Sequence, residues 1–138
     1  MQNSETISII KRRFDEKGNP AQIPLLKGDR TFEAKLEKNG VYVSNLGNEP
    51  FLPWNIFVKT VSFLRKNGGQ AVRGNAMNGR LGDHKLPIDS VEGHIARAVY
   101  DKQKGDAVFR RITPIACILI WAGICRHKPR ELVLMGFA

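Results

Sequence analysis

The sequence predicts an α+β fold in which a helical core is combined with β-hairpins near both ends of the chain. Three observations support this prediction. Residues 31–43 alternate apolar and charged side chains around an Asn-Gly pair, which is typical of a hairpin. Residues 54–64 and 91–99 repeat apolar side chains every three or four positions, as amphipathic helices do. Residues 112–124 are apolar almost throughout, which indicates a helix buried in the core.

A chain of 138 residues with 42% hydrophobic residues has the size of one domain and can form a core without disulfides or metal ions. We expect a single domain over residues 24–138. Residues 1–23 are polar and irregular and contain the charged run Lys11–Lys17, so we expect them to form a flexible basic arm.

The charge of the chain points to an anionic partner. Lys and Arg outnumber Asp and Glu by 22 to 13, which gives a net charge of +9. Residues 67–138 hold eleven Lys or Arg, six Asp or Glu and all three His. Nucleic acid is the commonest anionic partner of a small basic domain, and a merely solvated basic surface is the alternative.

Cysteine usage and the N-terminal sequence favour a cytoplasmic location. Cys117 and Cys125 are eight residues apart on or near one helix, too far apart to form a disulfide. The first residues lack the charged start, apolar core and cleavage site of a secretory signal. The apolar run near residue 118 is shorter than the roughly 20 residues that cross a bilayer, so we expect no membrane contact.

The first predicted element is a β-hairpin over residues 31–45. A two-residue turn at Asn39-Gly40 pairs Leu36 with Val43 and places both on the face that carries Phe32. We expect this apolar face to cover the central helix.

A helix is predicted from Pro53, and Asn67-Gly68-Gly69 ends it because both residue types tolerate a left-handed cap. Residues 70–87 are polar and rich in glycine and are predicted to be a loop, with a short helix at residues 75–81 as the alternative. They lack the Gly-Lys-Ser or Gly-Lys-Thr step of a phosphate-binding loop, so a nucleotide-binding motif is not indicated.

A further helix is predicted over Asp89–Lys102, where Asp89 and Glu92 have capping-box spacing. The central helix follows, with Thr113-Pro114 at its start and Gly123 at its end. Basic residues around Pro129 then form a tight turn, and residues 132–134 form the returning strand of a basic hairpin.

From residue 54 onward this order resembles a winged helix-turn-helix, in which three helices share a core and a terminal hairpin, the wing, contacts DNA. Two stretches carry a closer resemblance: FVKTVSFLRKNGGQAVRGNAM and ILIWAGICRHKPRELVL. They are similar to the winged-helix domain at the N-terminus of Mrr-type restriction proteins, through Ala122-Gly123-Ile124, Pro129–Leu134 and Gly68-Gly69. The chain departs from that pattern in its more apolar central helix and in the additional helix Asp89–Lys102.

The net charge of +9 and the predicted wing together indicate double-stranded DNA as the partner, and two candidates remain for the recognition element. One is the helix Asp89–Lys102, and the other, which we favour slightly, is the lead-in Arg110-Arg111. Surface ion pairing of these arginines is the structural alternative. The predicted DNA contacts are Arg73, Asn75, Asn78, Arg80, Lys85, His94, Arg97, Lys102, Arg110, Arg111, Arg126, His127, Lys128 and Arg130.

The sequence therefore predicts a non-catalytic DNA-binding domain that acts as a transcription regulator or as the targeting module of a restriction or mobile-element system. We expect no cofactor and no metal, because Cys117, Cys125 and His127 are too few and too badly spaced for zinc. We expect no catalytic activity, because Ser90, Glu92 and His94 do not share one helix face and so cannot form a catalytic triad. The alternative function is a protein-interaction module that forms a homodimer through the apolar helix.

Overall fold

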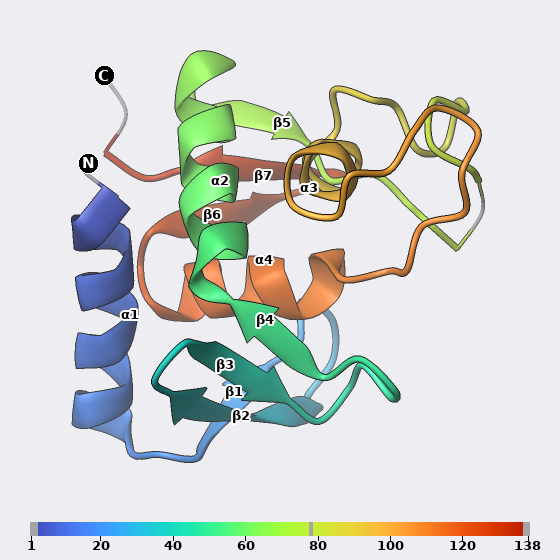
Figure 1. Cartoon of the computed structure of the whole chain (residues 1–138). Coiled ribbons are helices and arrows are strands. Elements are labelled where there is room, and N and C mark those ends of the chain that lie inside the picture. Colours follow the sequence, from blue (N-terminus) through green and yellow to red (C-terminus); the bar gives the residue numbers. More distant parts are fainter. Residues whose placement is uncertain (1–2, 78, 137–138) are drawn as a thin grey trace.

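The structure is a computed structural model that describes residues 3–77 and 79–136 (Figure 1). Its described part is an α+β fold in which two antiparallel sheets lie on either side of a central helix. The first sheet comes from the N-terminal half of the chain and the second from the C-terminal half.

The first sheet has the strand order β1-β2-β3-β4, with neighbours antiparallel. Its strands are β1 (Ala21–Pro24), β2 (Thr31–Glu37), β3 (Gly40–Val43) and β4 (Phe51–Pro53). Phe32, Ala34, Val41 and Val43 are buried on one face, as alternation predicts. The predicted hairpin is therefore confirmed as β2–β3, whereas β1 and β4 were not predicted.

The predicted register of this hairpin is wrong by two residues. Leu36 pairs with Val41, not with Val43, and Lys38 and Asn39 form the turn. Gly40 lies within β3 instead, where a Cβ would be only 2.2 Å from the carbonyl oxygen of Leu52 in β4. A shift of two residues keeps each side chain on its face, so the predicted buried face is unaffected.

The expected flexible arm is wrong, because residues 3–17 form helix α1 (Asn3–Lys17). Ile10 and Phe14 lie one turn apart and are both buried. The ring of Phe14 meets that of Trp121 edge to face, with 4.9 Å between centroids. Helix α1 thus belongs to the same hydrophobic core as the remainder of the chain.

Helix α2 (Trp54–Lys66) is confirmed and ends at Asn67, as predicted. Helix α3 (Val91–Ala98) is shorter than the predicted Asp89–Lys102. Its N-cap is Ser90, whose hydroxyl oxygen accepts a 3.0 Å hydrogen bond from the backbone N–H of Gly93, so Asp89 is not the cap. The short helix considered at residues 75–81 is not formed in the described residues.

Helix α4 (Ile112–Trp121) is the predicted central helix, and its seven residues Ile112 and Pro114–Leu119 are all buried. It lies between the two sheets and contacts β1, β6, α1 and α2 (Figure 1). Its helical residues start before Thr113, so the predicted Thr113 cap is wrong and Arg111 occupies the N-cap position.

The second sheet has the order β5-β7-β6 and is antiparallel. Its strands are β5 (Gln70–Val72), β6 (Cys125–Lys128) and β7 (Glu131–Leu134), of which β5 was not predicted. The C-terminal hairpin is confirmed, with Pro129 and Arg130 as its turn. None of the helices in residues 3–77 and 79–136 is both long and apolar enough to cross a bilayer.

Candidate nucleic-acid interface

A cleft of about 800 Å³ opens between segments that are far apart in the sequence. The β1–β2 loop, the loop after β5, the start of α4 and the end of the β6–β7 hairpin all contribute to it. We call it the basic cleft. Its lining residues are Leu25, Leu26, Lys27, Arg30, Val72, Arg73, Gly74, Asn75, His84, Lys85, Pro87, Arg110, Ile112, Thr113, His127 and Arg130.

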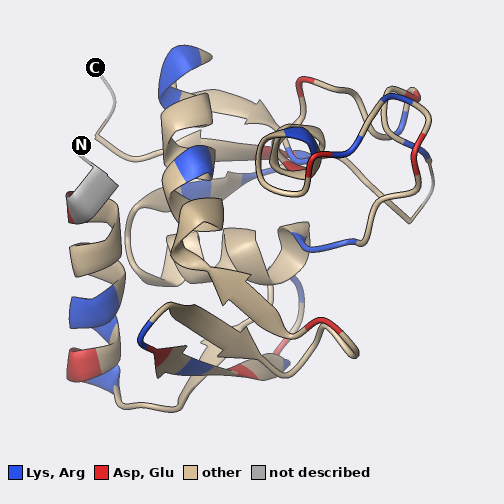
Figure 2. Cartoon of the chain, in the orientation of Figure 1, with Lys and Arg blue, Asp and Glu red and all other residues tan. Residues whose placement is uncertain are grey.

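The charge of the basic cleft is of one sign. Six Lys or Arg and two His line it, and no Asp or Glu of the described residues does. None of the six cations pairs with a carboxylate in the part of the chain that the structure describes. Figure 2 shows Lys and Arg on the lead-in to α4, while α4 itself carries no charged residue. Cations gathered without counter-ions create a positive potential that favours an anion.

Arg73 connects the end of β5 to the β6–β7 hairpin. Its backbone N–H donates to the carbonyl oxygen of Arg130 at 2.8 Å. Its Nη1 donates to Nδ1 of His127 at 2.9 Å, because a guanidinium has no acceptor, and weakly to the carbonyl oxygen of Glu131 at 3.4 Å. Burial lowers the pKa of the Arg73 guanidinium, since desolvation disfavours its charge. An anion beside Arg73 would offset that penalty.

Arg130 occupies an unusual backbone conformation at the tip of the hairpin. It follows Pro129 and has a φ of 64°, as in the third position of a type II turn, where glycine is favoured. A side chain in this left-handed region costs about 1 kcal/mol relative to glycine. The turn therefore keeps a cation at the edge of the basic cleft at some cost in local stability.

The backbone at the start of α4 is already occupied by Glu92. Oε1 of Glu92 accepts hydrogen bonds from the backbone N–H groups of Arg111 at 2.7 Å and Ile112 at 3.2 Å. Glu92 is 1% exposed, and burial raises its pKa to about 7. These N–H groups are thus satisfied inside the protein, so the attraction of the cleft for anions comes mainly from side chains.

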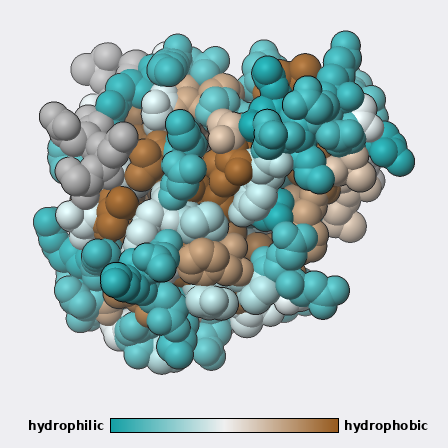
Figure 3. Space-filling model, viewed as in Figure 1, coloured by the Kyte–Doolittle hydropathy of each residue, from teal (hydrophilic) through white to brown (hydrophobic). Residues whose placement is uncertain are grey.

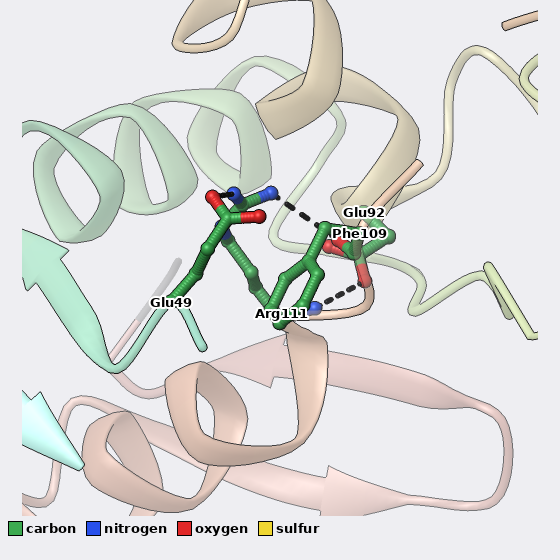
Figure 4. A network of polar contacts seen from close by, with 4 residues as sticks. All are labelled: Glu49, Glu92, Phe109 and Arg111. Atoms are coloured by element: carbon green, nitrogen blue, oxygen red, sulfur yellow. Dashed lines mark hydrogen bonds and ion pairs between the residues drawn. The ribbon is translucent and has the colours of Figure 1, made fainter. Parts of the chain in front are cut away.

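The two arginines that lead into α4 have different surroundings. Arg110 is exposed and lines the basic cleft, and its Nη1 lies 2.9 Å from Sδ of Met77. Arg111 is 5% exposed, and its Nη2 pairs with Oε1 of Glu49 at 2.7 Å (Figure 4). The guanidinium of Arg111 also stacks against the ring of Tyr100, 3.7 Å from its centroid. Arg111 is therefore a structural residue, and we leave it out of the interface.

The structure brings together six of the fourteen predicted DNA contacts and separates the others. The residues in the basic cleft are Arg73, Asn75, Lys85, Arg110, His127 and Arg130. Those outside it are Arg80, His94, Arg97, Lys102, Arg111, Arg126 and Lys128. Asn78 lies outside the described residues. Of the two candidate recognition elements, the helix α3 contributes nothing to the cleft and the lead-in contributes Arg110.

Several of the predicted contacts outside the cleft interact within the protein. His94 stacks on Phe63 with 4.4 Å between ring centroids, and burial lowers the pKa of its imidazole. Nη1 of Arg80 donates to the carbonyl oxygen of Gly105 at 3.3 Å. Nζ of Lys128 lies 3.8 Å from a carboxylate oxygen of Glu131. Arg97 and Arg126 are exposed.

Sequence reasoning missed three basic residues of the cleft: Lys27, Arg30 and His84. Lys27 and Arg30 lie in the loop between β1 and β2. Lys27-Gly28-Asp29-Arg30 resembles an ordinary turn, and its place beside the C-terminal hairpin depends on the sheet β1–β4. Gly28, in a polar turn between two stretches that carry apolar side chains, was the one local signal of a β1–β2 hairpin.

Ser90 and Glu92, two of the residues considered for catalysis, make hydrogen bonds within the protein. The Ser90 hydroxyl donates to the carbonyl oxygen of Pro87 at 2.7 Å and caps α3, while Glu92 caps α4. Ser90 and Glu92 are both buried, so neither lies on the surface of the protein. Cys117 and Cys125 are buried free thiols, and burial raises their pKa to about 11 and about 12. Within the described residues, no group of three potential metal-binding side chains is found.

Compared with models of protein families, with curated proteins and with solved structures, the chain matches none. The function is therefore inferred from the site alone.

Proposed function

We propose that this protein binds double-stranded DNA without catalysing a reaction, and that the basic cleft is the centre of its contact surface. The observation that carries the proposal is the gathering of six cations without carboxylate partners from four separate segments. Phosphate contacts of this kind release condensed counter-ions and supply most of the affinity of non-specific DNA binding.

The topology of the C-terminal part supports a winged-helix arrangement. The order α2, β5, α3, α4, β6, β7, with β5-β7-β6 in the sheet, has three helices and a terminal hairpin that serves as the wing. Arg130, at the tip of this wing, lies at the edge of the basic cleft. The proposed surface thus combines the wing with the lead-in to α4.

The proposed binding mode differs from that of a typical helix-turn-helix. In those domains the second helix of the motif lies in the major groove. Helix α4 follows α3 but is covered by the first sheet and by α1, so it cannot lie in the major groove. We therefore expect phosphate contacts and DNA shape to dominate over base reading, which suits the targeting module of a larger system as well as a regulator.

The structure gives little support to the alternative function, a homodimer formed through the apolar helix. Most of the apolar side chains of this helix are buried within the same chain, and Ile120 and Trp121 are partly buried against the same core. Figure 3 shows one face of the molecule, on which hydrophobic side chains form small separate patches among hydrophilic ones. The large apolar side chains exposed among the described residues are Tyr42, Val72, Met77 and Met135.

Fluorescence anisotropy with a short labelled duplex of random sequence tests the proposal. The triple variant Lys85→Ala, Arg110→Ala, Arg130→Ala removes three cleft cations, and we expect it to weaken binding about tenfold or more. The matched control Arg12→Ala, Lys59→Ala, Arg97→Ala removes the same charge from exposed positions outside the cleft. Equal losses of affinity in the two variants, at unchanged circular dichroism, would show that the cleft has no special role.

A further inference from the structure

The basic cleft carries apolar side chains that contacts to a duplex backbone do not require. Leu25, Leu26, Val72, Pro87 and Ile112 line it together with the cations. Phosphates on the outside of a duplex are met by charged and neutral hydrogen-bond donors, and apolar side chains supply no such donors. The lining therefore matches a ligand that has both an anionic group and an apolar group.

The size of the basic cleft fits such a ligand. Clefts that enclose small molecules have volumes of roughly 300–1,000 Å³, and this one has about 800 Å³. Asn75 and Thr113 add neutral hydrogen-bonding groups to the lining. Oδ1 of Asn75 accepts from the backbone N–H of Met77 at 3.0 Å, which fixes the side chain and leaves its amide NH₂ as the donor group.

We propose that the basic cleft takes up one unpaired nucleotide of the bound DNA. Arg73 and Arg130 hold its phosphate, and the base lies against the apolar walls near Val72 and Leu26. A base inside a continuous duplex is stacked and paired and cannot enter, whereas a nucleotide in a single-stranded end or a bulge is free to do so. This inference rests on the proposed DNA binding and adds a preference for unpaired nucleotides.

Three DNA molecules separate the possible sources of that nucleotide. The first is a duplex whose two ends are closed by covalent linkers without nucleotides, the second has one end opened to a short 5′-phosphorylated overhang, and the third is closed but contains one bulged nucleotide. We expect the open or the bulged molecule to bind about tenfold more tightly than the closed one, because burying roughly 50–60 Å² of base surface against apolar side chains is worth about that factor. If only the molecule with the overhang binds more tightly than the closed duplex, the cleft takes up nucleotides at strand ends. If the overhang and the bulge both strengthen binding, the cleft takes up any unpaired nucleotide.

The variant Val72→Trp tests the location without changing the charge. Val72 is 41% exposed on strand β5, so a larger side chain fills the cleft at little cost to the fold. We expect this variant to lose the preference for DNA with an unpaired nucleotide and to keep the affinity of the wild type for the closed duplex. Tyr42→Trp, at a site 45% exposed and outside the cleft, is the matched control and should keep both.

The outcomes distinguish this inference from the function on which it rests. Equal binding of all three DNA molecules by the wild type would overturn the inference and leave DNA binding intact. A preference that survives in Val72→Trp would also overturn it. No binding of any of the three, even at low salt, would instead overturn the proposed function.

Discussion

Arg110 and Arg111 illustrate how little adjacency in the sequence says about the role of a residue. Both were expected to meet DNA, yet the first is exposed at the basic cleft and the second is buried against Tyr100 and paired with Glu49. Glu49 and Tyr100 are far from residue 111 in the sequence, so no local pattern identifies the buried arginine. Contacts between residues far apart in the sequence therefore decide which of the two arginine side chains remains available to bind DNA.

Arg130 allows binding and stability to be separated at a single residue. Arg130→Gly relieves the positive φ of 64° at the hairpin tip and removes one cleft cation. We expect the free energy of unfolding to stay the same or rise by up to about 1 kcal/mol, because the gain at the left-handed position is partly offset by the freer unfolded chain. We expect the affinity for DNA to fall. Urea unfolding measures the stability, and fluorescence anisotropy measures the affinity for DNA. A variant that is less stable than the wild type and binds DNA with the same affinity would contradict this account of the turn.

At the scale of elements, Glu92 couples α3 to the start of α4 and makes the junction sensitive to pH. Its pKa is ordinarily 4.5, and burial raises it to about 7 in the folded protein. The folded state therefore binds this proton more tightly than the unfolded state. The stability contributed by the protonated form is fully present below about pH 4.5 and is lost as the pH rises through about 7.

Glu92→Gln isolates that effect, because glutamine keeps an acceptor oxygen and cannot ionise. We expect the difference in unfolding free energy, wild type minus variant, to fall by about 2 to 3 kcal/mol between pH 4.5 and about pH 8. Chemical denaturation of the wild type and of Glu92→Gln at several pH values measures this difference. A constant difference would mean that the hydrogen bonds from Arg111 and Ile112 outweigh the cost of burying the charge.

Elements with a strong local pattern were predictable from the sequence. The alternation around Asn39-Gly40 gave the hairpin, and the all-apolar run gave the buried helix α4. Helix α1 was missed because the side chains it buries, such as Ile10 and Phe14, are separated by charged residues and resemble a polar arm. The register error arose because Gly40 is required for its close approach to Leu52, a contact with a strand that was not predicted.

At the scale of the whole molecule, the basic cleft could be predicted only in part. Its C-terminal residues were found from the charge excess and the turn around Pro129. Lys27 and Arg30 reach it through the packing of β1 on α4, which brings the N-terminal sheet beside the β6–β7 hairpin. Charge composition therefore predicts that a basic surface exists, while long-range packing decides which residues form it.

The dependence of DNA affinity on salt tests the central claim, that phosphates of DNA bind at the basic cleft. The logarithm of the association constant falls linearly with the logarithm of the salt concentration, and the slope becomes shallower by about 0.9 for each phosphate that the protein no longer neutralises. The triple variant Lys85→Ala, Arg110→Ala, Arg130→Ala should therefore have a slope shallower than that of the wild type by about 2.7. The control variant Arg12→Ala, Lys59→Ala, Arg97→Ala should keep the slope of the wild type. A wild-type affinity that does not change with salt, or a cleft variant whose slope equals that of the wild type, would contradict the claim.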